Sequence, residues 1–242
     1  MQKRASWLVF FIRLAAMALG GFAVCGVPPA RAEDAKPNPC NEDAMLVFDA
    51  SGSMSGPVLP GNGGTANRID QARLAVGKVL PSVTKYRRVG LITYGPGPYN
   101  QCNVELNLKP TPNAARIIMD VVNAIVPAGH TPLTAAVKQA ADVLDYTAKP
   151  GIIVVLTDGE ETCGGSPCEI GKALHALAKH LTVHVIAYRP GIVSWMGEGG
   201  IGEAKCLADQ TGGLYITAKT EDDLVQALEK TLDCPMTSEL TR

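Results

Sequence analysis

Three separated segments of the sequence carry side chains whose oxygen atoms suit a hard metal ion. Asp49, Ser51 and Ser53 lie in the first segment, Thr131 in the second and Asp158 in the third. A divalent cation such as Mg²⁺ takes about six oxygen ligands and usually keeps water among them. Two carboxylates and three hydroxyls meet that requirement and leave a position for a ligand from outside the chain. Thiolate and imidazole groups, which would favour zinc, are absent from this set.

The spacing within the first segment has a physical reason. In a turn that leaves a strand, alternate residues can point toward one spot, so we expect Asp49, Ser51 and Ser53 to converge. Both serines are neutral, so the charge of the ion is only partly compensated and the ion attracts a further carboxylate. The sequence therefore predicts Mg²⁺, with Mn²⁺ or Ca²⁺ as alternatives, bridging to an Asp or Glu of a protein partner. Taken singly, these residues more often cap helices or form turns, so the prediction depends on their occurring together.

The elements that would position these segments alternate along the chain. Apolar, β-rich runs predict strands at Ala44–Phe48, Val89–Tyr94, Val104–Leu108, Ile152–Thr157, Thr182–Tyr188 and Gly213–Ile216. Helical periodicity lies between most of them, at Ile69–Leu80, Ala114–Ile125, Leu133–Tyr146, Cys168–His180, Gly202–Gln210 and Glu221–Leu232. No helix separates the second run from the third, which indicates an antiparallel hairpin at one edge of the sheet.

This alternation predicts an α/β fold with a six-stranded, mainly parallel sheet and helices on both faces. In such sheets, ligands bind at the carboxyl ends of the strands, near a switch in strand order. Asp49 directly follows the first predicted strand and Asp158 directly follows the fourth. We therefore expect the metal-binding segments to meet at this edge of the sheet.

At these residues the chain resembles the von Willebrand factor A domain family and its metal-ion-dependent adhesion site. The resemblance covers roughly Asp43 to Leu232 and rests on three segments in order, namely Asp49-Ala50-Ser51-Gly52-Ser53, Thr131 and Asp158. Further similarity is found in Arg88-Val89-Gly90-Leu91, Asp158-Gly159-Glu160-Glu161-Thr162-Cys163 and Thr211-Gly212-Gly213-Leu214-Tyr215. The resemblance implies a doubly wound, Rossmann-like sheet with one antiparallel edge strand. It also implies that Ser51, Ser53 and Thr131 contact the metal, with Asp49 and Asp158 bound directly or through water.

The first 32 residues differ from the rest and predict a cleaved secretory signal peptide. Basic Lys3 and Arg4 precede an apolar run, and Ala30-Arg31-Ala32 offers a small-residue cleavage site. A retained N-terminal anchor is the alternative, and a lipoprotein at Cys25 is disfavoured by the preceding valine. Residues 33–42 are expected to form a linker, 43–234 the domain and 235–242 a tail. No later run approaches about 18 apolar residues, so we expect no membrane span after cleavage, and a secreted or periplasmic location.

Composition and charge limit the class of protein. Apolar residues make up 46% and charged residues 19%, which excludes a disordered chain. The formal net charge is −1, and cleavage of the leader would leave 18 basic against 23 acidic residues. A nucleic-acid partner is therefore not expected.

Six of the seven cysteines follow the leader, and an even number in an exported chain favours disulfides. Cys163 and Cys168 are close in sequence, so a local bridge across the intervening turn is plausible. Cys40 and Cys234 flank the domain, where a bridge would tie its ends. Cys102 and Cys206 then pair by elimination, although other connectivities remain open. A zinc site is not expected, because clustered cysteine or histidine ligands are absent.

The sequence patterns of two classes of hydrolase are not matched in the segment that follows the first predicted strand. Ser51 stands where a haloacid-dehalogenase-type phosphatase needs a second Asp, and Met54 stands where a nucleophile elbow needs its serine. We therefore predict a binding protein and not an enzyme. The alternatives are a structural or assembly protein whose metal only stabilises loops and, less favoured, a hydrolase.

Three residues are candidates for contact with the partner. Trp195 lies in a Gly-rich loop after the fifth predicted strand and could serve as an aromatic anchor, or it could pack on its own domain. His130 is adjacent to Thr131 and could line the rim of the site, or simply be exposed. Glu160 follows Asp158 and could repel poorly aligned acidic partners, or, with Glu161, be a solvated charge.

Overall fold

The computed structural model describes Cys40 and residues 42–58, 66–97, 101–189 and 201–234. The expected leader, most of the expected linker, the expected tail and Trp195 lie outside these residues. Within the described ranges, every helix is too short or too polar to traverse a bilayer.

The strands form one six-stranded sheet in the order β3-β2-β1-β4-β5-β6. They are β1 (Asp43–Asp49), β2 (Val89–Tyr94), β3 (Val104–Thr111), β4 (Pro150–Thr157), β5 (His180–Tyr188) and β6 (Tyr215–Ala218). The β2–β3 pair is antiparallel and every other neighbouring pair is parallel. The predicted fold, a mainly parallel sheet with one antiparallel edge strand, is confirmed.

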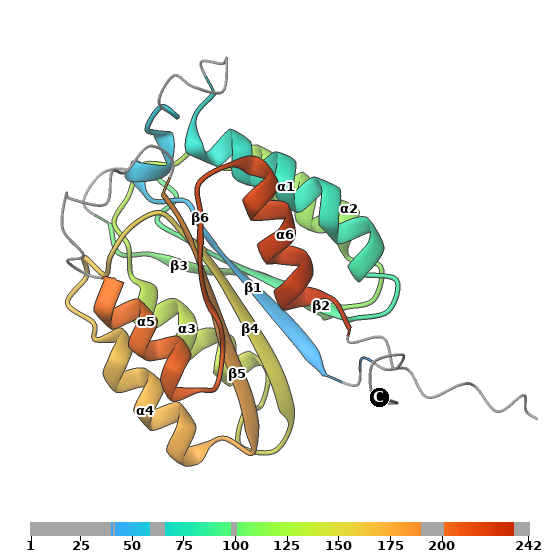
Figure 1. Cartoon of the computed structure of the whole chain (residues 1–242), viewed down its shortest axis with the longest axis vertical. Helices are drawn as coiled ribbons and strands as arrows, with labels where there is room; N and C mark the ends of the chain where they lie inside the picture. The colour runs from blue at the N-terminus through green and yellow to red at the C-terminus, as the bar shows by residue number, and fades with distance from the viewer. Residues whose placement is uncertain (1–39, 41, 59–65, 98–100, 190–200, 235–242) are drawn as a thin grey trace, which may run out of the picture. The chain divides into compact units, whose positions relative to one another are not determined.

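Helices cover both faces of this sheet (Figure 1). They are the short 3₁₀ helix η1 (Gly52–Ser55), α1 (Arg68–Val83), α2 (Ala115–Ala124), α3 (Leu133–Val143), α4 (Pro167–Leu177), α5 (Ile201–Gln210) and α6 (Glu221–Leu232). Helices α1, α2 and α6 pack on one face, and α3, α4 and α5 pack on the other. The topology is therefore doubly wound.

The central strand β1 shows why the sheet is buried on both sides. Its residues from Ala44 to Asp49 are all fully buried. Leu46 and Phe48 point into the core beneath α1, α2 and α6, whereas Met45 and Val47 point into the core beneath α3, α4 and α5. Because successive side chains of a strand alternate between faces, a continuous apolar run is what two packed faces require.

The disulfides correct two of the expected pairings. Cys40 pairs with Cys234, with their Cα atoms 5.6 Å apart. The expected Cys163–Cys168 and Cys102–Cys206 bridges are wrong, because the structure has Cys102–Cys163 and Cys168–Cys206. Cys163 lies in the loop after β4, beside the β2–β3 loop that carries Cys102, whereas Cys168 lies in α4 against Cys206 of α5. Closeness in sequence did not predict the direction in which each cysteine faces.

Candidate metal centre

The two acidic segments lie side by side at the carboxyl edge of the sheet. Strands β1 and β4 are parallel neighbours, with Phe48 opposite Leu156. Asp49 is the last residue of β1, and Asp158 comes directly after Thr157, the last residue of β4. The strand order runs outward from β1 in one direction and from β4 in the other, so this is the switch point where ligands bind in such sheets.

Asp49 is fully buried and its carboxylate accepts hydrogen bonds from three groups. The backbone N–H of Ser51 donates to Oδ1 at 2.7 Å, while the hydroxyls of Tyr94 and Thr157 donate to Oδ2 at 2.9 and 2.7 Å. Burial, and secondarily the negative charge of Asp158, raise the pKa of Asp49 to about 6, although the bonds from Ser51 and Thr157 oppose that rise. A cation at this place would relieve both causes of the rise.

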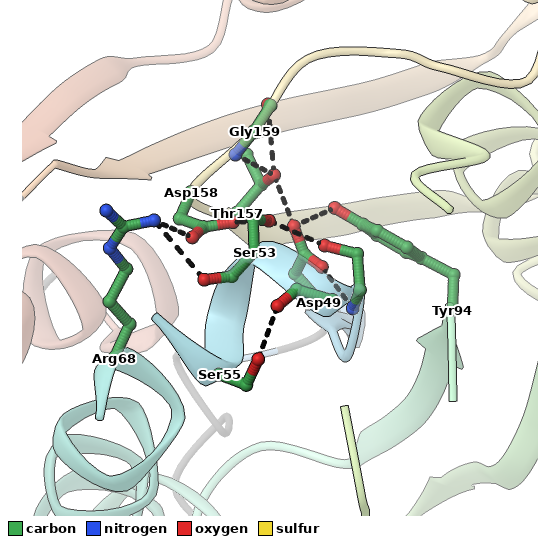
Figure 2. A network of polar contacts seen from close by, with 10 residues as sticks. Asp49, Ser53, Ser55, Arg68, Tyr94, Thr157, Asp158 and Gly159 are labelled. Atoms are coloured by element: carbon green, nitrogen blue, oxygen red, sulfur yellow. Dashed lines mark hydrogen bonds and ion pairs between the residues drawn. The ribbon is translucent and has the colours of Figure 1, made fainter. Parts of the chain in front are cut away.

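A chain of short contacts connects the serines to the second carboxylate (Figure 2). The hydroxyl oxygens of Ser51 and Ser53 lie 2.9 Å apart, and Ser53 donates to Asp158 Oδ1 at 2.5 Å. Ser51 is buried and its backbone pairs with Gly129, whereas Ser53, in the first turn of η1, is exposed. The turn after β1 therefore turns both hydroxyls toward the end of β4.

Thr131 joins this group from the segment that leads into α3. It is 4% exposed, and its backbone exchanges two hydrogen bonds with Thr162, at 2.8 Å from Thr131 N to Thr162 Oγ1 and 3.0 Å from Thr162 N to the Thr131 carbonyl. A Cβ placed on Gly159 would lie 3.6 Å from both Ser53 Oγ and Thr131 Oγ1. The hydroxyls of Ser53 and Thr131 are therefore close to the same point, and the structure brings the five predicted residues together.

The partner-contact candidates have different surroundings. His130 is half-buried on the rim, where its backbone N–H donates to the Gln101 carbonyl at 2.9 Å. Glu160 is exposed beside the site. Glu161 is not a solvated charge, because its carboxylate accepts from the backbone N–H of Thr134 at 2.8 Å and of Cys163 at 2.7 Å. It therefore helps to hold the loop after β4 against the start of α3.

Three residues of the site were not predicted from the sequence. Tyr94 and Thr157 hold the Asp49 carboxylate, and the only sequence signal was a polar residue at the end of each buried strand. Arg68, the first residue of α1, donates from Nη1 to Asp158 Oδ2 at 2.7 Å and to the Ser53 carbonyl at 3.3 Å. Figure 2 shows Arg68 and Tyr94 approaching the cluster from opposite sides.

The chemistry of the donors fits a hard divalent cation. The described residues contain no cluster of three or more His, Cys, Asp or Glu side chains, so hydroxyls must complete any ligand set. Carboxylate and hydroxyl oxygens are ligands typical of Mg²⁺, Mn²⁺ and Ca²⁺. Two carboxylates face one guanidinium at this site, which leaves a net negative charge for an ion to neutralise.

Comparisons with known proteins agree with this architecture. Residues 44–161 match the von Willebrand factor type A domain family. The uncharacterized protein YwmC of Bacillus subtilis (strain 168) is 27% identical over 192 residues, covering 75% of this chain and 79% of that protein. A D319A mutant of the PilB minor pilin from Streptococcus sanguinis has a similar fold, with a TM-score of 0.58, 16% identity, and coverage of 79% of this chain and 60% of that one.

A second similar structure contains a metal. It is proximal thread matrix protein 1 from the mussel byssus with a zinc-occupied MIDAS motif, with a TM-score of 0.52, 18% identity, and coverage of 81% of this chain and 48% of that one. At these identities the two structural similarities establish the fold alone. The chain therefore has the fold and, over residues 44–161, the sequence signature of the von Willebrand factor type A domain family.

Proposed function

We propose that this protein binds a protein partner through a divalent cation, for which Mg²⁺ is the expected ion. Asp49, Ser51, Ser53, Thr131 and Asp158 would hold the ion. The bound ion would supply an open coordination position for an Asp or Glu carboxylate of the partner. The observation that carries the proposal is the convergence of two carboxylates and neutral hydroxyls at one switch point of the sheet.

The charges explain why the last ligand would come from outside. Asp49 is buried and its charge is destabilised, so the metal-free site favours a cation. Hydroxyl ligands add no charge, and an ion held mainly by neutral groups retains affinity for an anionic oxygen. A Glu or Asp on a partner surface provides that oxygen.

The neighbours in fold support the class of function. PilB is a pilin, and the mussel byssus protein holds zinc in its MIDAS motif. The cysteines of Cys40–Cys234, Cys102–Cys163 and Cys168–Cys206 are paired, which supports an oxidising, secreted or periplasmic location of the kind the leader predicts. Catalysis is not part of the proposal, and a screen for phosphatase and esterase turnover would check that prediction.

The first test is to titrate the purified protein with Mg²⁺ and to measure the binding affinity by isothermal titration calorimetry. Thr131→Val should weaken Mg²⁺ binding by roughly tenfold, because it removes one oxygen ligand and keeps the shape of the side chain. Thr134→Val is the matched control, since the buried Thr134 hydroxyl has no hydrogen-bond partner among the described residues. Equal Mg²⁺ affinity in both variants would contradict the ligand set.

The second test is retention of partner proteins from an envelope extract, in Mg²⁺ and in EDTA. The wild type and Thr134→Val should retain the same proteins in Mg²⁺ and lose them in EDTA. Asp49→Ala should retain none of them in either condition, provided that circular dichroism shows a folded protein. Retention that is insensitive to EDTA would mean that the metal only stabilises loops.

A further inference from the structure

Away from the five candidate metal ligands, a cleft of about 550 Å³ lies between the β2–β3 hairpin and the end of α2. Its floor is formed by Thr93 of β2 with Glu105 and Asn107 of β3, and Glu105 lies directly opposite Thr93 in the antiparallel register. The last turns of α2 form its wall. We call this the hairpin cleft.

Two polar atoms in the hairpin cleft have no hydrogen-bond partner in the described part of the chain. The hydroxyl of Thr93 and the Oδ1 atom of Asn107 are buried and form no hydrogen bond with any described residue. Thr93 is fully buried, so bulk water does not satisfy its hydroxyl either. A buried acceptor without a donor costs free energy, and a ligand that brings N–H groups would recover it.

The ionisable side chains that line the hairpin cleft are both acidic. Glu105 and Asp120 line it and, within the described ranges, neither forms an ion pair. No described Lys or Arg is among its lining residues. The carboxyl end of α2 adds little to this charge, because the Arg73 guanidinium donates hydrogen bonds to the carbonyls of Val122 and Ile125. The hairpin cleft therefore favours a cationic ligand that donates hydrogen bonds.

The rim of the hairpin cleft is apolar. Val121, Ala124 and Ile125 line it, and Val126 is 71% exposed. A hydrated inorganic ion would gain nothing from these groups. A Lys or Arg side chain would place its alkyl stem against them and its charged end among the acceptors.

The hairpin cleft shares its border with the metal-binding turn. Pro96 and Gly97 line it, and the preceding Gly95 is so close to Ser51 that a Cβ there would lie 2.8 Å from Ser51 Cα. Gly129, three residues beyond Val126, donates to the Gly95 carbonyl at 2.7 Å. One surface that reaches the metal centre would therefore also cover the hairpin cleft.

We propose that the hairpin cleft binds a Lys or Arg side chain of the same protein partner whose carboxylate reaches the metal. The partner would then present an acidic and a basic residue together. This inference extends the proposed function by naming the chemistry of the partner. The assignment of the ligand to that partner rests on the proposed function, whereas the binding of a cationic side chain in the hairpin cleft does not.

The cleft is tested first without a partner, by NMR titration of the ¹⁵N-labelled protein in EDTA. The probes are Nα-acetyl-arginine amide and Nα-acetyl-lysine amide, with Nα-acetyl-citrulline amide as the uncharged analogue of arginine. At least one cationic probe should give saturable shifts at Thr93, Asn107 and Val126, with a dissociation constant on the order of 1 mM. Citrulline shifts of equal size, or shifts that cluster elsewhere, would overturn the proposal.

Variants of the acidic residues identify the contacts. Glu105→Gln combined with Asp120→Asn should weaken binding of the cationic probe by roughly tenfold, because both charges are removed. Glu229→Gln on α6 is the matched control and should leave the affinity for the cationic probe unchanged. Thr131→Val should also leave this affinity unchanged while it weakens Mg²⁺ binding. Failure of the metal site and failure of the hairpin cleft therefore give different results.

Two further arms separate the possible occupants. Putrescine is titrated in EDTA, and CaCl₂ is titrated without EDTA into the Thr131→Val variant. If either binds the hairpin cleft at least tenfold more tightly than both amino-acid amides, the cleft is assigned to a free amine or a metal and the assignment to a partner is overturned. In the partner-retention assay, the Glu105→Gln, Asp120→Asn double variant should retain several-fold less partner while its Mg²⁺ affinity is unchanged. Undiminished retention by that variant would also overturn the assignment.

Discussion

Arg68 and Asp158 form an ion pair, with Nη1 of Arg68 2.7 Å from Oδ2 of Asp158. This carboxylate is one of the two that the sequence predicts as metal ligands. The carboxylate side chain is fully buried and the Arg68 side chain is 25% exposed. The other oxygen of Asp158 accepts from Ser53. A cation belonging to the chain therefore partly neutralises the site.

Replacing Arg68 by glutamine should strengthen Mg²⁺ binding by roughly tenfold, because the metal no longer competes with a positive charge for Asp158. Isothermal calorimetry at low and at high salt would measure the change, which should shrink as salt screens the charges. Arg116→Gln, on the surface of α2, is the control and should leave the affinity unchanged. Weaker Mg²⁺ binding in Arg68→Gln would instead mean that Arg68 supports the ligands.

Tyr94→Phe and Thr157→Val should each weaken Mg²⁺ binding several-fold. Each change removes a hydrogen bond that holds the Asp49 carboxylate in place, so this ligand is less well positioned for the ion. Thr157→Ser should restore the affinity, since it returns the hydroxyl.

Tyr188→Phe is the matched control for Tyr94→Phe. Tyr188 is also buried, but its hydroxyl has no hydrogen-bond partner among the described residues, so removing it should change neither the affinity nor the fold. Equal losses in the two phenylalanine variants would show that the effect is not specific to Asp49.

His184 should make the free energy of unfolding depend on pH. Burial, and secondarily the charge of Arg87, lower the pKa of His184 below 6.5, and its Nδ1 accepts from the backbone N–H of Leu214 at 3.0 Å. The folded state therefore binds the proton less tightly than the unfolded chain. The stabilising contribution of His184 to the free energy of unfolding is present above pH 6.5 and is lost as the pH falls below that value.

Urea unfolding between pH 7.5 and 5 would measure this effect as the difference between the wild type and His184→Gln. That difference should narrow as the pH falls. The exposed His175, replaced by glutamine, provides the control curve. A difference that widens toward low pH would contradict the sign.

The Cys102–Cys163 bridge should stabilise the protein and the metal centre together. It joins the β2–β3 loop to the loop after Asp158 and closes a long segment, so the double serine variant should lose about 2–4 kcal/mol of the free energy of unfolding. It should also bind Mg²⁺ more weakly. Mass spectrometry of an unreduced digest would test the connectivity, and a peptide linking Cys163 to Cys168 would disprove it.

The sequence by itself determined the class of fold and pointed to the five candidate ligand residues. Alternating strand and helix patterns are local properties, and the apolar run of β1 already requires two packed faces. Asp49 and Asp158 could be placed at one edge because carboxyl ends of parallel strands share an edge. These inferences needed only periodicity and the positions of strand ends.

Only the tertiary structure decided which distant side chains meet. Arg68 and Asp158 are 90 residues apart, and no local pattern indicates that the first residue of α1 reaches the end of β4. The pairing of Cys163 with Cys102, not with the nearby Cys168, follows from the placement of two loops in space. The hairpin cleft likewise follows from the placement of α2 beside the β2–β3 hairpin, where Thr93 and Asn107 each have a buried atom without a partner among the described residues. Such contacts depend on the relative positions of whole elements, which the spacing of residues along the chain does not specify.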